Sequence, residues 1–464
     1  MPSAGTEAEV CGCPICVSAA ENGAAYFARA FGAQRNISLT AESIADALGF
    51  CRRHGARVLT HTELVPAIGQ VFRDVVGRIG PMVAEDYARG DQFWQTFFGA
   101  RDACPACAHE QRAVSRHAGQ LARSYANSVD APASSTLACV CVAHLRRIAE
   151  ELSPELRMPF LAHCIDKMNN AERFLEESLT DYADCGAETR ENREREIQRS
   201  FNLAGGYGNA TAILRGASSS GECSYHTLAC HDPDSDHCPV CAEIERTRCR
   251  WMQSVQDAER HHIEGWLLFP TCPDHVATIS SLGDRKLTCA VMSNALRGAI
   301  GQVQYEIRRL IRAAETQEEF PAVRIAPWGK RRRRKSPGPK LVAPRPDECP
   351  ACERIVLAEA RAVGNLLDAL TREKYRDDYR RGYGLCMKHF AQAGLVAPRG
   401  AVRNTLCAHQ QARLTEDALA FDEIARTSKT SANDALQAPR YRSALHRICG
   451  FAGADALSLH AQPP

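Results

Sequence analysis

Two short cysteine motifs recur along this chain, and their residue types point to metal coordination. Each copy of Cys-Pro-x-Cys is followed, after 30 to 34 intervening residues, by a copy of Cys-x-x-His, and the pair occurs four times. Thiolate sulfur and imidazole nitrogen are the ligands that structural zinc sites use. Pairing the motifs in sequence order predicts four Cys3His sites: Cys13, Cys16, Cys51 and His54; Cys104, Cys107, Cys141 and His144; Cys238, Cys241, Cys272 and His275; Cys349, Cys352, Cys386 and His389.

The ligand types favour one Zn2+ per site and therefore four per chain. Three cysteines and one histidine complete a tetrahedral shell with no position left for water, which is typical of sites that stabilise a fold. An iron-sulfur cluster is the alternative cofactor, because the same ligands can hold one and Cys11 places an extra thiol beside the first motif. Redox-active CxxC pairs are a third alternative, but they would need a βαβ setting that the sequence does not indicate.

The motifs also predict local structure. Proline is favoured as the first residue of a helix, so the first cysteine of Cys-Pro-x-Cys should cap a helix and the second should lie in its first turn. The positive end of the helix dipole then favours thiolate over thiol. Helix-forming sequence also follows Cys-x-x-His, as in HLRRIAEEL and HFAQAGL. We therefore expect two helix N-termini to meet at each ion and to offset part of its negative charge.

The motifs resemble those of an uncharacterised family of bacterial and archaeal helical proteins. In that family a CxxC that opens a helix is followed by G-[FL]-C-x-x-H, and this chain contains CPIC with GFCRRH and, later, GLCMKH. Two other copies, LACVCVAH and FPTCPDH, depart from the pattern because they lack the glycine. The resemblance implies a helical fold and metal binding, and it implies no activity.

Apolar residues recur at helical spacing, which predicts an all-α protein. Ala20, Ala24, Phe27 and Phe31 lie at i, i+4, i+7 and i+11 and so share one helix face. The same kind of spacing recurs at Leu64, Ile68, Val71 and Val75, at Val303, Ile307 and Leu310, and at Val356, Val363, Leu367 and Leu370. The alternating runs rich in Val, Ile and Thr that strands need are scarce.

The motifs repeat in pairs, which predicts tandem duplicated helical bundles. The first two Cys-Pro-x-Cys motifs start 91 residues apart and the last two 111 residues apart, a difference of 20. A basic, proline-rich insertion at about 316–346 accounts for the extra length. We expect helical unit one at 8–216 and helical unit two at 234–455, each with two Cys3His sites, joined by a polar linker at 217–233.

Bulk composition gives no overall electrostatic field. The 464 residues include 57 basic and 55 acidic side chains, so binding to nucleic acid must rest on a local patch, and the clearest is the run KRRRRK from Lys330 to Lys335. No stretch of about 18 apolar residues is present, and the N-terminus lacks the basic and apolar segments of a signal peptide. We therefore expect a cytoplasmic protein with no membrane partner.

The remaining candidates carry little recognisable chemistry. The cluster between Cys223 and His237 has a spacing that matches no metal-binding template. Most cysteines outside the motifs should be small buried hydrophobic residues, although Cys11 and Cys139 are close enough to a motif to replace a ligand. We name no catalytic residue, which favours a non-catalytic role without deciding against an enzyme.

These observations lead to three hypotheses about function. The first is a metal-binding helical scaffold, stabilised by zinc, that interacts with a protein partner. The second is an iron-sulfur or redox-active metalloprotein. The third is an accessory nucleic-acid-binding protein that acts through the basic insertion.

Overall fold

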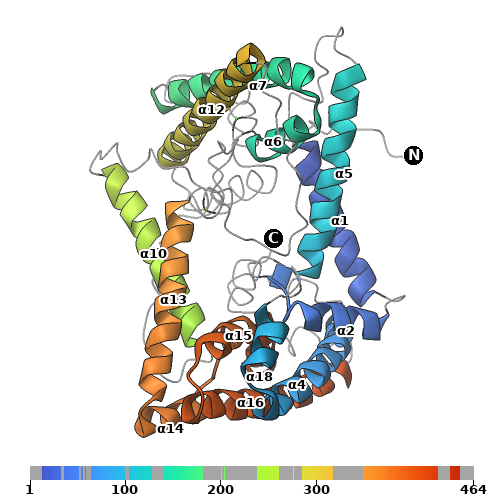
Figure 1. Ribbon diagram of the computed structural model, residues 1–464, viewed down its shortest axis with the longest axis vertical. Coiled ribbons are helices and arrows are strands. Elements are labelled where there is room, and N and C mark those ends of the chain that lie inside the picture. Colours follow the sequence, from blue (N-terminus) through green and yellow to red (C-terminus); the bar gives the residue numbers. More distant parts are fainter. Residues whose placement is uncertain are drawn as a thin grey trace, which may run out of the picture. The chain divides into compact units, whose positions relative to one another are not determined.

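The described part of the chain is helical. The computed structural model describes residues 13–32, 36–51, 64–99, 104–127, 140–180, 238–260, 285–316, 349–426 and 439–449, with isolated positions between them that include His54 and His275. No strand occurs among these residues (Figure 1). The prediction of an all-α fold is confirmed.

The helices begin where the motifs predict. They are α1 (Pro14–Phe31), α2 (Ile37–Asp46), α4 (Val65–Gly99), α5 (Pro105–Asn127), α6 (Val142–Glu151), α7 (Pro154–Thr180), α10 (Pro239–Arg260), α12 (Arg285–Thr316), α13 (Pro350–Leu370), α14 (Glu373–Arg381), α15 (Met387–Val396), α16 (Ala401–Arg426) and α18 (Pro439–Cys449). The proline of each Cys-Pro-x-Cys motif is the first residue of α1, α5, α10 or α13. Its missing N–H costs nothing at this position, because the first N–H groups of a helix have no partner within it.

The chain divides into two compact units that do not follow the expected repeat units at 8–216 and 234–455. Unit 1 comprises Met1–Ala20, Arg112–His226 and Cys249–Arg354, and unit 2 comprises Glu21–Gln111, Thr227–Arg248 and Ile355–Pro464. Each compact unit therefore combines segments from the N-terminal half of the chain (1–226) and from its C-terminal half (227–464). The unit boundaries fall inside α1, α5, α10 and α13. The duplication itself stays a prediction.

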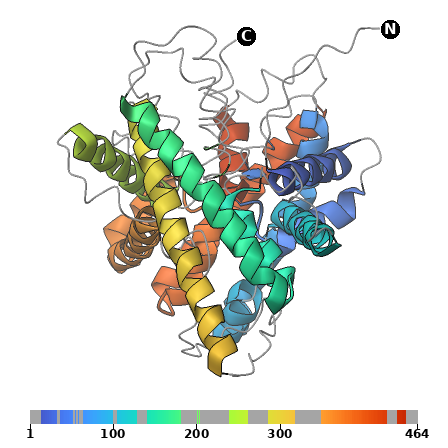
Figure 2. The same cartoon turned by 90° about the horizontal axis from the view of Figure 1, so that it is seen from above.

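Unit 1 has its core between α7 and α12, which lie along each other (Figure 2). Buried side chains of both helices belong to one apolar cluster, which includes Phe160, Leu161, Met168, Met292, Leu296 and Val303. At the edge of this pair, the Arg297 guanidinium forms ion pairs with Glu172 and Glu176. Because α7 belongs to the N-terminal half and α12 to the C-terminal half, this core joins the two halves.

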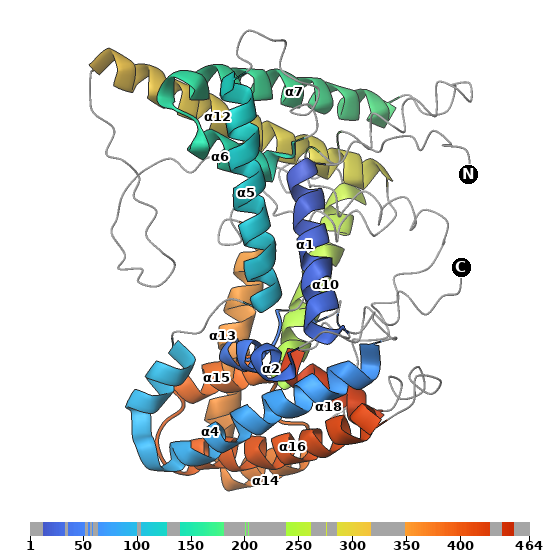
Figure 3. The same ribbon diagram turned by 90° about the vertical axis from the view of Figure 1, so that its right-hand side faces the viewer.

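Unit 2 is built in the same way from α4 and α16, which run side by side (Figure 3). The rings of Phe72 and Phe421 stack with centroids 5.5 Å apart. Gly69 permits the close approach, since a Cβ atom there would lie 2.8 Å from the backbone nitrogen of Ala425. Helices α1, α2, α13, α15 and α18 also contribute buried side chains to this apolar cluster. The core of unit 2 therefore also joins the two halves of the chain.

None of the described helices combines the length and apolar character that crossing a membrane requires.

Candidate metal centres

Four clusters of cysteine and histidine side chains that could hold metal ions lie in the described part of the chain. We call them site 1 (Cys13, Cys16, Cys141 and His144), site 2 (Cys51, His54, Cys104 and Cys107), site 3 (Cys238, Cys241, Cys386 and His389) and site 4 (His275, Cys349 and Cys352). The ligand atoms within each site lie within 4.8 Å of one another. Cys272, the expected fourth member of site 4, lies outside the described residues.

The predicted grouping of the motifs is wrong, although the motifs do meet in pairs. In each half of the chain, the first Cys-Pro-x-Cys meets the second Cys-x-x-His, and the first Cys-x-x-His meets the second Cys-Pro-x-Cys. The grouping is therefore nested rather than sequential. Cys13 and Cys16 lie with Cys141 and His144, not with the Cys51 motif, and the other three sites are regrouped in the same way.

Two Cys-x-x-His motifs lie far along the long helix that precedes them in the sequence. Helix α1 has 18 residues and rises about 27 Å from its first cysteines. The ring of Phe27, near the end of α1, lies 5.9 Å from the ring of His54. In the C-terminal half, His389 contacts Glu359, which lies well inside α13, whereas Cys349 and Cys352 lie at the start of that helix. The ligand pairs at the starts of α1 and α13 therefore have their partners elsewhere in the chain.

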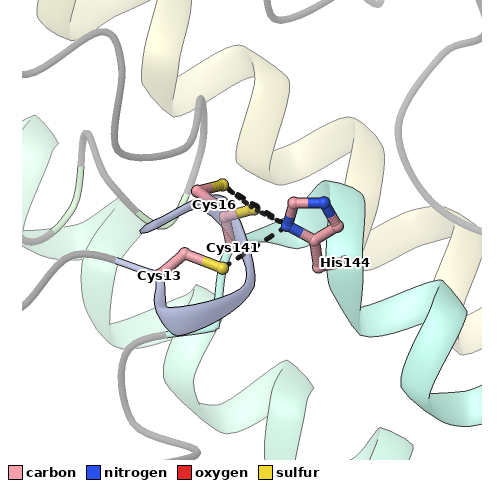
Figure 4. Close-up of side chains that lie close together, drawn as sticks. All are labelled: Cys13, Cys16, Cys141 and His144. Atoms are coloured by element: carbon pink, nitrogen blue, oxygen red, sulfur yellow. Dashed lines mark hydrogen bonds between the residues drawn. The ribbon is translucent and has the colours of Figure 1, made fainter. Parts of the chain in front are cut away.

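Site 1 shows the local geometry most clearly (Figure 4). The side chains of the four residues point toward a common centre. His144 Nδ1 lies 3.4 Å from the Sγ atoms of Cys13 and Cys16 and 3.2 Å from Cys141 Sγ. The Sγ atoms of Cys16 and Cys141 are 3.6 Å apart. All four atoms thus surround a space that suits a single small ion.

The other three sites repeat this geometry. Nδ1 of His54 lies 3.3 to 3.5 Å from its three sulfurs, and Nδ1 of His389 lies 3.2 to 3.3 Å from its three. Nδ1 of His275 lies 3.7 Å from Cys349 Sγ and 3.4 Å from Cys352 Sγ. The nitrogen that faces the sulfurs is Nδ1 in every case. A common ligand atom at four sites indicates a common mode of coordination.

These distances match a tetrahedron around one zinc ion. Zn–S bonds of about 2.3 Å and Zn–N bonds of about 2.1 Å at tetrahedral angles place two sulfurs about 3.8 Å apart and a sulfur about 3.6 Å from the nitrogen. One Sγ–Sγ separation at each of sites 1, 2 and 3 is 3.5 to 3.7 Å. The Sγ–Nδ1 separations at the four sites are 3.2 to 3.7 Å. The side chains need little movement to bind such an ion.

Helix N-termini position the cysteines, as the sequence predicts. The carbonyl oxygens of Cys13, Cys104, Cys238 and Cys349 each accept the first helical hydrogen bond, at 2.9 to 3.0 Å. At sites 1 and 3 a second helix also begins at the metal centre, because Cys141 is the N-cap of α6 and Cys386 that of α15. Two positive helix ends therefore meet at each of these two sites and stabilise thiolate charge.

Sites 2 and 3 share a glycine two residues before the cysteine of Cys-x-x-His. Gly49 and Gly384 have φ angles of 105° and 83°, which residues with a side chain rarely adopt. Space is restricted as well, since a Cβ atom at Gly49 would lie 2.2 Å from the carbonyl oxygen of Ile448, and one at Gly384 would lie 2.8 Å from Cδ2 of His409. The glycine in GFCRRH and GLCMKH therefore has a steric cause.

Two carboxylates, the buried Glu110 and the partly buried Glu359, contact the histidines of sites 2 and 3. His54 Nε2 lies 2.9 Å from Glu110 Oε1, and His389 Nε2 lies 3.0 Å from Glu359 Oε1. A carboxylate can only accept a hydrogen bond, so Nε2 carries the proton and Nδ1 is free to bind a metal. Lys388 Nζ lies 2.8 Å from the same oxygen of Glu359.

Sequence reasoning missed both carboxylates. Glu110 follows Cys107 by one helical turn, and this i, i+3 spacing was a usable signal. Glu359 belongs to α13, whereas the cysteines of its site come from α10 and from the start of α15. No local pattern could have assigned Glu359 to site 3.

At sites 1, 2 and 3, hydrogen bonds between neighbouring sulfurs lower the pKa of one cysteine and raise that of another. The pKa is lowered at Cys13, Cys104 and Cys386 and raised at Cys141, Cys107 and Cys241. Burial lowers the pKa of His144, but the neighbouring Cys13 and Cys16 sulfurs outweigh burial and raise that pKa to about 9. In the same way, Cys386 and Cys238 outweigh burial and raise the pKa of His389 to about 12. Hydrogen bonds with Cys107 and Cys51 lower the pKa of Cys104 to about 3. At sites 1, 2 and 3 the histidine pKa is thus raised beside a thiolate, and a bound cation could supply that positive charge instead.

No family model, no curated protein and no solved structure matches this chain. The geometry of the four sites and the helices that carry them are therefore the basis for assigning a function.

Several predicted features lie outside the described residues. These are Cys11, Cys139, the Cys223 to His237 cluster and the Lys330 to Lys335 run. Among the cysteines beyond the motifs, Cys164, Cys289 and Cys407 are buried in the apolar clusters, as expected. Burial raises the pKa of Cys164 to about 12, so its thiol stays protonated and unreactive.

Proposed function

We propose that this protein is a helical scaffold stabilised by four structural Zn2+ ions, and that it acts by binding a protein partner. One observation carries the metal assignment: at every site, Nδ1 of one histidine and the cysteine sulfurs lie at the spacing of a tetrahedral shell around one ion. Metal coordination would fix the starts of the long helices to the segments that carry Cys51, Cys141 and Cys386.

The compact spacing favours a single ion over an iron-sulfur cluster. All ligand atoms of a site lie within 4.8 Å of one another. A cluster contains several irons, and cysteines bound to different irons lie farther apart than ligands of one ion. The proposed cofactor is therefore one zinc ion per site, and iron-sulfur or redox chemistry is the weaker alternative.

A structural role is supported by the closed ligand sets and by burial. Sites 1, 2 and 3 each supply four protein ligands, which leaves no position for a substrate or a reactive water. Site 3 is the most enclosed, because all four of its residues are buried. These features are typical of zinc that stabilises a fold rather than zinc that catalyses a reaction.

A protein partner is the proposed target because exposed apolar side chains are available on the surface of unit 2. Val356 and Leu357 are neighbours on α13 and are 60% and 51% exposed. Apolar groups of this kind contribute to association when a partner covers them. Contact with nucleic acid through Lys330 to Lys335 stays a prediction.

Metal analysis with chelation tests the proposal. Protein purified without oxygen should contain close to four zinc ions per chain, with negligible iron and labile sulfide and no visible absorption. Removing the zinc with a strong chelator should lower the helical circular dichroism signal, and returning Zn2+ should restore it. Stoichiometric iron with sulfide would overturn the zinc assignment, and an unchanged helical signal after complete zinc removal would overturn the structural role.

A further inference from the structure

Every candidate metal site is formed within one half of the chain. Sites 1 and 2 use residues of the N-terminal half (1–226), and sites 3 and 4 use residues of the C-terminal half (227–464). The compact units divide the sites differently, because unit 1 contains sites 1 and 4 and unit 2 contains sites 2 and 3. Each half therefore contributes one site to each unit.

The apolar cores show the opposite arrangement, because each of them needs both halves. In unit 1, α7 of the N-terminal half packs along α12 of the C-terminal half. In unit 2, α4 of the N-terminal half packs along α16 of the C-terminal half, with the Phe72 and Phe421 rings in contact. The metal ligands thus connect segments within a half, and the apolar cores connect the two halves.

The exchange between the halves is reciprocal. Helices α4 and α12 each follow the first Cys-x-x-His motif of their half, and α7 and α16 each follow the second. Each core pairs a helix that follows the first motif of one half with a helix that follows the second motif of the other half: α4 with α16, and α12 with α7. An ion pair also links the helices of each core. Arg73 on α4 contacts Asp422 on α16, and Arg297 on α12 contacts Glu176 on α7.

We propose that the two halves are interlocked in the manner of two chains that have exchanged helices, so that each half is the binding partner of the other. The apolar faces of α4 and α7 are completed by α16 and α12, and a half without its partner would expose both faces. Continuity of the chain between His226 and Thr227 is then unnecessary once the protein has folded. This inference rests on helix packing and does not depend on the proposed zinc.

Cleavage of the full-length folded protein provides the test. A protease recognition sequence inserted between His226 and Thr227 allows the chain to be cut after folding, and a denaturing gel identifies the cut molecules. The two fragments should elute together, at the volume of the uncut chain, in size-exclusion chromatography without denaturant. Separation of the fragments into two peaks would overturn the proposal.

Two variants locate the contact that holds the fragments together. In the cut protein, Phe421→Ala should lower the urea concentration at which the fragments separate, because it removes the ring that stacks on Phe72. Leu419→Ala, on the same helix but 59% exposed, should leave that concentration unchanged. Equal effects of the two variants would contradict a role for the α4 and α16 core. If Phe421→Ala does not fold, elution of the cut wild-type chain alone decides.

The zinc content of the cut protein, read together with its elution, separates this inference from the proposed function. Cut protein that contains no zinc as purified, yet elutes as one species, would refute the zinc proposal and support interlocked halves. Cut protein that contains zinc but separates into fragments would do the reverse.

Discussion

The imidazole rings of His54 and His389 are fixed at both nitrogens. Nδ1 faces three sulfurs, and Nε2 donates a hydrogen bond to Glu110 or Glu359. Such a carboxylate orients the ring and makes the ligating nitrogen more basic, which strengthens metal binding. Glu110 lies on α5, which also carries Cys107 of its site, whereas Glu359 lies on α13, which carries no ligand of site 3.

Replacing a carboxylate should therefore weaken metal binding at one site only. We expect Glu110→Ala to lower the zinc affinity of site 2 by about 10- to 100-fold, because the orientation of His54 is no longer fixed. Competition with a coloured zinc chelator measures this change as one ion per chain that is lost early. Glu42→Ala, an exposed glutamate of the same unit, should release zinc like the wild type. Uniform loss of all four ions would contradict a local role for Glu110.

Gly384, two residues before the ligating Cys386, gives a second prediction about a single residue. We expect Gly384→Ala to lower the free energy of unfolding by about 1–3 kcal/mol, because alanine would adopt a strained positive φ and crowd the buried ring of His409. Gly364→Ala, in an exposed helical position with no atom near the new methyl group, should instead stabilise the protein by about 0.5–1 kcal/mol. Urea denaturation of both zinc-loaded variants measures the difference. Equal destabilisation by the two changes would argue against the special backbone at Gly384.

At the scale of the helices, the sequence predicts where they start but not how their motifs group into sites. Starts of α1, α5, α10 and α13 follow from one local rule, the favourable position of proline in the first turn, and the structure confirms all four. The grouping of motifs into sites depends instead on where tertiary packing brings each motif. Nearest-in-sequence pairing fails for the Cys51 motif because His54 lies beside Phe27, near the end of α1, and not beside Cys13 and Cys16 at its start.

Pairs of cysteine substitutions distinguish nested from sequential grouping. If Cys16 and Cys141 bind the same ion, the double variant Cys16→Ser with Cys141→Ser should lose about one zinc ion per chain. Cys16→Ser combined with Cys51→Ser should lose about two, because these residues belong to sites 1 and 2. Mass spectrometry of the metal content measures both. Cys407→Ser, a buried cysteine outside the motifs, is the control and should retain the full complement.

The opposite pattern of zinc loss would contradict the nested grouping. Loss of one ion from Cys16→Ser with Cys51→Ser, and of two from Cys16→Ser with Cys141→Ser, would restore the sequential grouping that the order of the motifs suggests. The experiment reads only metal content, so it needs no knowledge of the partner.

At the scale of the whole molecule, the repeat visible in the sequence does not define the compact units. The periodic apolar positions of α4, such as Ile68, Val71 and Val75, correctly predict a buried helix face. They carry no information on which helix covers that face. Its partner α16 begins at Ala401, about 300 residues after α4 ends at Gly99. Apolar surface is not directional enough to single α16 out from the other amphipathic helices.

The faster local opening caused by losing one metal site should therefore spread within a compact unit and not within a half of the chain. We expect Cys141→Ser to loosen the start of α6 and, through the shared core of unit 1, to speed amide hydrogen exchange in α7 and in α12. Helix α12 belongs to the other half of the sequence, whereas α4 belongs to the same half as Cys141 but to unit 2. Exchange in α4 and α16 should change much less. Mass spectrometry of exchanged peptides compares the helices directly, and faster exchange in α4 with an unchanged α12 would mean that sequence halves, rather than compact units, are the cooperative elements of this protein.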